Sequence, residues 1–293
     1  MIEVIMKKDI VVGCITGYTF DKIKPWVESL DASGFDGTKA MICYNVDYDT
    51  VNELAKRNYS IFCFKKNDEE RRFEFKENFS IVVDRFYHLW YFLKQYRGQF
   101  KNIIATDVKD VVFQTNPSLF LDRVIRDGKK INVACESIHY KDEEWGDNNL
   151  LKSFGPLVHE HFRNNLIYNA GTVSGDFDTM LDLFLNIFLT CGSAPQFVEG
   201  GGGPDQAALN ILLQLEPYKS ITNFAMSEDC YAAQLGTTGP QVSGKYGAKL
   251  VEKSPILVDN MVCTSNGQVF PIVHQYDRVP EWKEIIEKKY ASN

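Results

Sequence analysis

IVVGCI, at residues 10–15, is the first of three short apolar runs that decide the fold of this chain. KAMICY comes next at residues 39–44 and SIFCF at residues 60–64, and helical patterns at about 22–30 and 50–57 separate them. The runs are apolar at consecutive positions, so the sheet that they form needs cover on both faces. Short buried strands that alternate with helices predict a mainly parallel sheet with helices on both faces, the α/β class.

The same alternation continues along the chain. Residues 80–96 repeat apolar side chains every three or four positions, which predicts a long, largely buried helix. Further strands are expected at 102–105, 132–135, 167–174 and 269–273, and further helices at 177–190, 204–215 and 281–290. The strand at 269–273 is apolar and is therefore expected near the centre of the sheet. Residues 136–165 are expected to form loops with short helices, and the glycine-rich residues 231–249 a surface loop.

Composition limits the functions that the chain can have. Its net charge is −7 and its pI is near 5.4, which argues against a nucleic-acid binder. The sequence contains no apolar run long enough for a transmembrane segment and no signal peptide, so a cytoplasmic location is expected. Its seven cysteines are odd in number and show no C-x-x-C spacing, which favours reduced thiols in the core. With no repeat or linker in 293 residues, a single domain is expected.

Ligands of parallel α/β sheets bind at the carboxyl ends of the strands, so the residues directly after each apolar run are the candidates. Thr16 and Tyr18 come after the first run and are candidates to hold a nucleotide base and ribose. An ordinary strand-to-helix turn explains them equally well. No G-x-G-x-x-G motif is present there, so a dinucleotide cofactor is not expected.

Two carboxylates stand where the strand at 102–105 ends, in the stretch ATDVKDVVFQTNP. Asp107 and Asp110 are suited to Mg²⁺ or Mn²⁺, which prefer oxygen ligands. On an extended strand, side chains three positions apart point to opposite faces, so the two carboxylates converge only if the chain turns between them. The alternative is a solvated turn around Lys109.

Three later stretches add candidates. Residues 168–172 (YNAGT) end an apolar strand in small residues that let a ligand approach the backbone. Asp205 and Gln206 come after Pro204 at the start of a helix, where an acid also has a purely structural role beside the helix dipole. His274 ends the last strand, as a metal ligand or a structural histidine, and Arg278 lies four positions later.

The order of these motifs, D-x-x-D-V-V-F-x-x-x-P, Y-N-A-G, P-D-Q-x-x-L-N and V-H-x-Y, resembles the GT-A fold nucleotide-diphospho-sugar glycosyltransferases. The similarity is greatest to the glycogenin-like and plant cell-wall branches and covers roughly residues 10–280. It departs from them at one place, because Lys109 stands where the second aspartate of the usual D-x-D motif belongs.

The resemblance implies the roles of the candidate residues. It makes Asp107, Asp110 and His274 the ligands of Mn²⁺ or Mg²⁺. It places Asp205 near the reacting carbon of the donor sugar, where this residue either positions the sugar or serves as the acid at the reacting centre. It implies that a nucleotide-donor half covers about 1–135 and an acceptor and sugar half about 136–293. Together with Thr16 and Tyr18 after the first strand, the residues expected to bind the donor are Arg85, Asp107, Asn169, Ala170, Gly171, Gln206 and Arg278.

The expected function is therefore metal-dependent transfer of a sugar from a nucleoside diphosphate sugar, most simply a UDP-sugar, to a glycan or other hydroxyl acceptor. The D-Q pair leans towards retention of configuration. Two alternatives remain: a sugar nucleotidyltransferase, and a nucleotide-sugar-binding module without catalysis. His159 and His161 are expected in a loop on the acceptor side, and Trp145, in the polar stretch KDEEWGDNN, is the tryptophan to test as a sugar platform.

Overall fold

A seven-stranded sheet forms the centre of the computed structural model, which describes residues 7–197 and 201–291. The strand order is β11-β9-β10-β7-β1-β2-β4, and only β10 runs antiparallel to its two neighbours. The strands are β1 (Ile10–Thr16), β2 (Thr38–Tyr44), β4 (Ser60–Cys63), β7 (Asn102–Thr106), β9 (Ile131–His139), β10 (Leu166–Asp176) and β11 (Thr222–Ala225). The expected mainly parallel sheet is confirmed.

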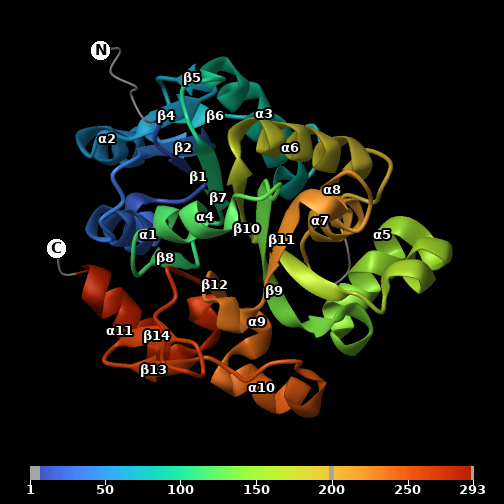
Figure 1. Cartoon of the computed structure of the whole chain (residues 1–293). Helices are drawn as coiled ribbons and strands as arrows, with labels where there is room; N and C mark the ends of the chain where they lie inside the picture. Colours follow the sequence, from blue (N-terminus) through green and yellow to red (C-terminus); the bar gives the residue numbers. More distant parts are fainter. Residues whose placement is uncertain (1–6, 198–200, 292–293) are drawn as a thin grey trace, which may run out of the picture.

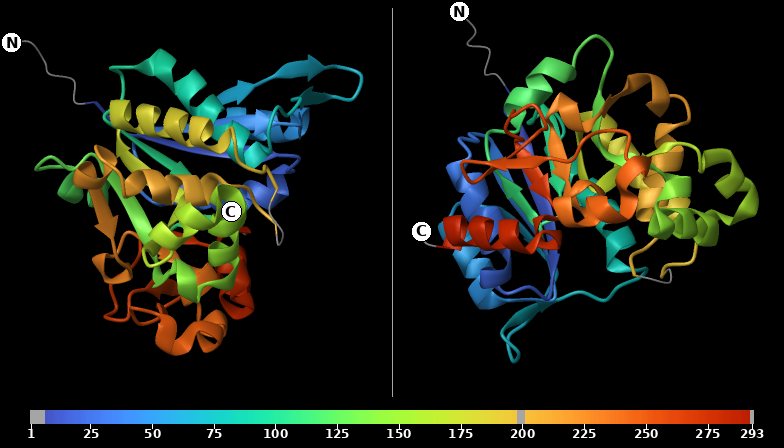
Figure 2. Two further views of the ribbon diagram at one scale, coloured as in Figure 1. Left: turned by 90° about the vertical axis from the view of Figure 1, so that its right-hand side faces the viewer. Right: turned by 90° about the horizontal axis from the view of Figure 1, so that it is seen from below.

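Helices cover both faces of this sheet because alternate side chains of each strand point to opposite sides. Ile10 and Val12 of β1 join one hydrophobic cluster, whereas Val11 and Ile15 join another. Figure 2 shows α6 along one face and the orange and red C-terminal segment beyond the other. The first cluster packs under α3 (Ile81–Leu93), α6 (Phe177–Cys191) and α7 (Asp205–Leu213), and the second under α1 (Phe20–Ala32), α2 (Tyr48–Lys56) and α4 (Ser118–Val124).

The late strand does not enter the central sheet, and that expectation is wrong. Instead β15 (Ile272–His274) lies between β12 (Ala232–Gln234) and β8 (Val111–Phe113) in a separate three-stranded sheet. Val273 is buried against α11 (Pro280–Ala291), whereas Ile272 joins the hydrophobic cluster under α1. A short apolar run shows that a strand is buried, but it does not show in which sheet.

Residues 136–165 are more ordered than expected. Strand β9 continues to His139, and α5 (Glu144–Phe162) contains most of the residues between β9 and β10. Gly155 interrupts this helix with φ 79° and ψ 173°, immediately before Pro156. His159 and His161 therefore lie on a helix rather than in a loop, and His159 Nε2 is 2.8 Å from Asp147 Oδ1, which gives it a structural partner.

The glycine-rich stretch 231–249 is also not a surface loop. Tyr231, Ala233 and Leu235 are fully buried. The segment folds into β12 and two short helices, α9 (Leu235–Thr238) and α10 (Pro240–Tyr246), and then the 3-10 turn η4 (Gly247–Lys249). Glycine marks a departure from regular structure, yet here it allows close packing instead.

The remaining elements are short. They are β3 (Val46–Asp47), β5 (Lys65–Asn67) and β6 (Arg72–Glu74), which form a small sheet, β13 (Ile256–Val258) and β14 (Met261–Cys263), which form a hairpin, α8 (Tyr218–Ile221), and the 3-10 turns η1 (Lys94–Tyr96), η2 (Tyr140–Asp142), η3 (Ser227–Asp229) and η5 (Tyr276–Arg278). All seven cysteines are free thiols, as expected. Among the described residues, no helix combines the length and hydrophobicity needed to cross a membrane.

Candidate functional site

Asp107 and Asp110 converge because the chain turns sharply after β7. The Asp107 amide donates to the carbonyl oxygen of Gly171 (2.8 Å), and the Gln275 amide donates to the carbonyl oxygen of Asp110 (2.8 Å). These bonds hold both ends of the turn against neighbouring strands. The two carboxylates and the His274 imidazole offer ligand atoms that all lie within 4.8 Å of one another.

His274 reaches this turn through the register of the small sheet. It pairs with Val111, the residue directly after Asp110, in the antiparallel pair of β15 and β8. Its Nε2 lies 3.6 Å from Asp107 Oδ2 and 3.7 Å from Asp110 Oδ1. The predicted trio is therefore brought together, although the strand that carries His274 belongs to a different sheet from the one expected.

Gln234 orients the His274 ring. Its Oε1 lies 2.7 Å from His274 Nδ1, and its Nε2 donates to Thr172 Oγ1 (2.6 Å). An amide held in this way accepts the Nδ1 proton, so Nε2 is the nitrogen that faces the carboxylates. A second partner that fixes the tautomer is typical of histidines that ligate metals. Nothing in the sequence pointed to Gln234.

Gly171 leaves the room in which these side chains meet. A Cβ atom at this position would lie 2.7 Å from Asp107 Oδ2 and 2.7 Å from His274 Cε1. Both separations are shorter than a Cβ tolerates, so any other residue would push the carboxylate and the imidazole apart. Glycine is therefore needed here to make room for the two side chains. The sequence had instead suggested that the small residue lets a ligand approach the backbone.

Arg85 joins the acidic turn to the start of α7. It projects from α3, and its Nη1 donates to Asp107 Oδ1 while its Nη2 donates to Asp205 Oδ2 (3.1 Å). Asp205 is buried, as is the Arg85 guanidinium for the most part. The structure thus brings two further predicted residues to the same place as Asp107.

Gln206 and Asn210 attach α7 to β10. Gln206 Oε1 accepts the Ala170 amide (3.3 Å). Asn210 bonds both to the amide of Tyr168 (2.8 Å) and to its carbonyl oxygen (2.7 Å). The asparagine of the P-D-Q-x-x-L-N motif therefore has a structural role, because it holds the helix that carries Asp205 at a set height on the strand.

Carboxylates are crowded in this site, and their pKa values are shifted from the usual range. Burial raises the pKa of Asp205 and of Asp110 above the usual range. Burial also opposes ionisation of Asp107, but Arg85 and His274 outweigh it and hold the pKa of that carboxyl below its usual range. A group of partly buried carboxylates is costly to keep ionised without a partner, so the place where they converge is suited to a cation.

Glu136 is a further carboxylate of the site and is buried, and the sequence interpretation missed it. It accepts a hydrogen bond from Asn169 Nδ2 (2.7 Å), and burial raises its pKa to about 7. Asn169 Oδ1 in turn accepts the Gly171 amide (2.6 Å), which links Glu136 to the glycine that lies against Asp107 and His274. The signal was present, because Glu136 comes directly after the apolar run 132–135, just as Asp107 comes shortly after 102–105.

Two cavities meet at Arg85 and Asp107. The first, of about 490 Å³, is lined by Thr16, Tyr18 and Arg278 together with the acidic turn. The second, of about 430 Å³, contains the remaining predicted residues Asn169, Ala170, Gly171, Asp205, Gln206 and His274, and also Glu136 and Trp145. Arg85, Asp107 and Arg278 line both. The predicted site residues therefore all lie on one continuous surface.

Comparison with known proteins places the fold. No protein-family model and no curated protein sequence matches the chain. Among solved structures, the apo structure of the WbbM bifunctional glycosyltransferase matches with a TM-score of 0.56 and 12% sequence identity. The match covers 98% of this chain and 52% of that one, so this chain spans about half the length of its structural neighbour. The chain therefore has an α/β, Rossmann-like fold of the kind found in that glycosyltransferase.

Proposed function

We propose that this chain transfers a glycosyl group from a nucleoside diphosphate sugar, a UDP-sugar in the simplest case, to a hydroxyl acceptor. The observation that carries this proposal is the convergence of Asp107, Asp110 and His274 at the junction of two cavities. A nucleoside diphosphate sugar has the same layout: two parts of different chemistry joined by a charged diphosphate. The fold shared with a glycosyltransferase supports the proposal.

The nucleoside occupies the cavity beside β1. Thr16 and Tyr18 provide a hydroxyl and a ring there, and Arg278 and Lys109 provide positive charge near the diphosphate. This part of the site draws mainly on residues 1–135, which is the donor half suggested by the sequence. Gly202 and Arg278 are the exceptions, and Arg278 comes from the 3-10 turn η5 near the C-terminus.

Asp107, Asp110 and the Nε2 atom of His274 are the residues that would hold a divalent cation, Mn²⁺ or Mg²⁺. Their mixture of carboxylate oxygens and one imidazole nitrogen suits Mn²⁺. Because Gly171 has no side chain, Asp107 and His274 are able to approach each other. A cation held there would neutralise the charge that develops on the leaving diphosphate. Arg85, fixed between Asp107 and Asp205, holds both carboxylates in place for this task.

The donor sugar occupies the second cavity, of about 430 Å³, which is called the sugar cavity below. Asp205 and Glu136 are among its lining residues. Asp205 lies beside Arg85 at the junction, where the bond to the leaving diphosphate would break, and we assign it to the reacting centre. Because burial raises its pKa to about 7, Glu136 is partly protonated at neutral pH, and in that form it is able to donate a hydrogen bond to a sugar hydroxyl. Asn169 and Gln206 complete the polar side of the pocket.

The experiment that tests the proposal is thermal unfolding with UDP and Mn²⁺, added separately and together. A ligand that binds only the native state raises its stability, so the pair should raise Tm more than either alone. His274→Ala should abolish this synergy. His161→Ala, a change to an exposed histidine outside the site, should leave it intact. Equal stabilisation by UDP in excess EDTA would remove the metal from the mechanism.

Turnover separates the remaining alternatives. Incubation with a panel of UDP-sugars should release UDP in the presence of an acceptor. Tight UDP–Mn²⁺ binding without release from any donor in the panel would favour the sugar-binding module. Release of pyrophosphate from UTP and a sugar phosphate would identify a nucleotidyltransferase instead.

A further inference from the structure

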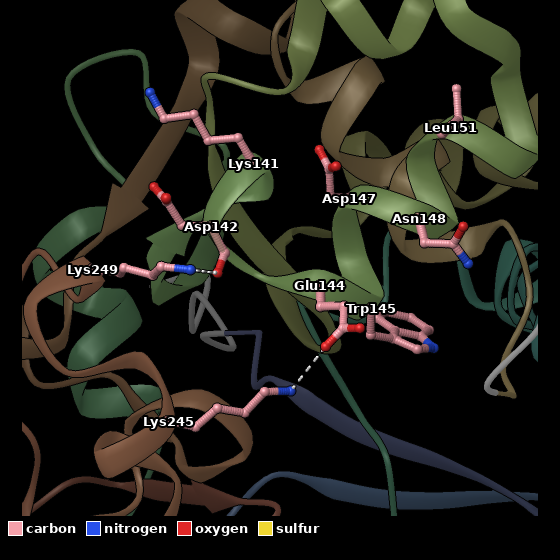
Figure 3. A pocket seen from close by; sticks show the side chains of 9 residues that line it. All are labelled: Lys141, Asp142, Glu144, Trp145, Asp147, Asn148, Leu151, Lys245 and Lys249. Carbon is pink, nitrogen blue, oxygen red and sulfur yellow. Dashed lines mark hydrogen bonds and ion pairs between the residues drawn. The ribbon is translucent and has the colours of Figure 1, made fainter.

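A third cavity lies beside the site, between the start of α5 and the end of α10, and the proposed function does not use it. This α5–α10 groove has a volume of about 730 Å³, and Trp145, Asn148, Lys245 and Lys249 are among its lining residues. Figure 3 shows lysines from the C-terminal segment on one wall, pointing toward Asp142 and Glu144 on the other. Trp145 also lines the sugar cavity, so the groove and that cavity adjoin at this residue.

Trp145 is unlike the other three tryptophans of the chain. Trp26, Trp90 and Trp282 each pack in or against a hydrophobic cluster, but Trp145 belongs to none of the clusters of the described residues. It is only partly buried, and its Nε1 donates to the carbonyl oxygen of Gly201 (3.2 Å). An aromatic ring held in a polar groove by its own N–H offers a flat apolar face without serving the core.

Glu143 sets the position of this ring. Its carboxylate accepts the backbone amides of Trp145 (3.3 Å) and Gly146 (2.5 Å) and the hydroxyl of Tyr246 (2.6 Å). Because Tyr246 ends α10, one carboxylate fixes both walls of the groove relative to each other. A platform held in this way needs little reordering when a ligand binds.

The lining favours a sugar over a peptide. Peptides are usually bound along an exposed sheet edge or in an apolar groove, and the described residues of this groove form neither. Asn148 makes no side-chain hydrogen bond within the described part of the chain, so its amide is free for a hydroxyl. A ring beside polar side chains matches a pyranose, which has apolar C–H faces and a hydroxyl rim.

Positive and negative charges in the groove are equal in number, which favours a neutral sugar over an acidic one. The charged lining residues are Lys141, Lys245 and Lys249 and, opposite in sign, Asp142, Glu144 and Asp147. Lys245 Nζ lies 3.5 Å from Glu144 Oε2, and Lys249 Nζ lies 3.5 Å from the carbonyl oxygen of Asp142. No excess of positive charge is left to attract a polyanion.

We propose that the α5–α10 groove binds an acceptor that is a neutral oligosaccharide, with one sugar stacked on Trp145 and its end directed into the sugar cavity at Asp205. This inference rests on the proposed glycosyl transfer, because it supplies the acceptor side of that reaction. It predicts that the preferred acceptor has more than one sugar unit, since Asp205 lines the sugar cavity and not the groove, and Trp145 lines both.

The test is binding of the full chain, with UDP and Mn²⁺ present, to an array of defined neutral and acidic oligosaccharides and the matching monosaccharides. We expect neutral oligosaccharides to bind better than their monosaccharides. Trp145→Ala should weaken this binding by about tenfold or more, and Trp145→Phe, which keeps a ring, should weaken it less. Tyr91→Ala, which removes an exposed ring from α3, should leave binding unchanged.

Three outcomes would overturn the proposal. They are binding of no oligosaccharide, equal binding by the wild type and Trp145→Ala, and a preference for acidic glycans that Lys245→Gln abolishes. The UDP–Mn²⁺ shift in Tm of the wild type, measured on the same preparation, distinguishes a failure of the groove assignment from a failure of the proposed function. If that shift is present and the array is blank, only the groove assignment fails; if it is absent, the proposed function fails first.

Discussion

Asp205 shows how one residue can have both a structural and a chemical reason for its position. It begins α7, where an acid interacts favourably with the helix dipole, and it also pairs with Arg85 at the junction of the two cavities. Burial raises its pKa, so the fold tolerates its charge at a cost rather than gaining from it. A residue that is expensive to keep ionised and that faces a cavity is a candidate for chemistry.

Asp205→Asn should therefore reduce turnover far more than stability. The change removes the charge and keeps the shape, so we expect kcat to fall by about 100-fold or more with UDP affinity nearly unchanged. Steady-state kinetics and UDP titration measure the two effects. Asp178→Asn, at an exposed acid in the first turn of α6, is the matched control. Reduced stability with normal turnover would make Asp205 a helix-start residue only.

Glu136 provides a pH-dependent prediction with a defined sign. Its pKa is about 7 in the folded chain and 4.5 for an unperturbed carboxyl, so between these values the folded state holds more protons than the unfolded state. Stability contributed by this residue therefore falls as pH rises from about 4.5 to 7. Glu136→Gln should remove that loss: it should stabilise the chain by about 3 kcal/mol at pH 8 and by little at pH 4.5.

Denaturant unfolding at the two pH values measures this difference. Glu160→Gln, at a largely exposed carboxylate on α5, should show no such dependence. A stabilisation by Glu136→Gln that is equal at pH 4.5 and pH 8 would mean that the carboxyl titrates normally and is not desolvated in the pocket.

At the scale of elements, α5 is the long helix that the sequence analysis did not predict. Its first residues carry many charges and amides, and Gly155 and Pro156 interrupt its second half, so neither the apolar period nor the composition indicated a helix. Tertiary contacts supply what the local pattern lacks: Leu150 and Phe162 pack with Ile138 of β9 and Ile167 of β10. Propensity is a weak prior that such packing overrides.

The kink in α5 can be tested by Gly155→Ala. The backbone there has φ 79° and ψ 173°, a region open to glycine almost alone, and no atom lies near a new Cβ. The cost is thus backbone strain of about 1–3 kcal/mol, with no steric clash. Gly244→Ala in α10, where φ is not positive and space is open, should instead be neutral or stabilising. Denaturant unfolding of both variants decides the matter, and equal effects would exclude the kink as the cause.

At the scale of the whole molecule, the candidate site depends on both ends of the chain. The first strands supply Thr16 and Tyr18, and the small sheet near the C-terminus supplies His274 and its partner Gln234. Figure 1 shows the red helix α11 next to α1, so the two ends of the chain lie side by side. Tyr290 of α11 donates to the carbonyl oxygen of Phe113 (3.2 Å), which fixes the last helix to β8.

This interdependence predicts a single cooperative unfolding transition, as proposed for one domain. Trp26, Trp90 and Trp282 belong to three different hydrophobic clusters, so tryptophan fluorescence reports on all of them. Fluorescence and circular dichroism should give coincident denaturant curves, with the same midpoint. An earlier fluorescence transition that disappears in Trp282→Phe would show that the C-terminal part unfolds separately and that the chain contains two units.

The sequence alone determined the α/β class, the alternation of strands and helices, and the position of the key carboxylates at strand ends. These features come from local rules, because burial on both faces of a strand is visible in consecutive apolar residues. It also predicted the trio of Asp107, Asp110 and His274 through its resemblance to a family of glycosyltransferases.

Only the tertiary structure decided how that trio meets. The turn after β7, the pairing of His274 with Val111, and the room above Gly171 are matters of register and close approach between segments far apart in the chain. The same is true of α5, of residues 231–249 and of the sheet that contains β15, where long-range packing and hydrogen bonds outweigh local preference. Glu136 and Gln234 entered the site for this reason, since their partners are supplied by other strands.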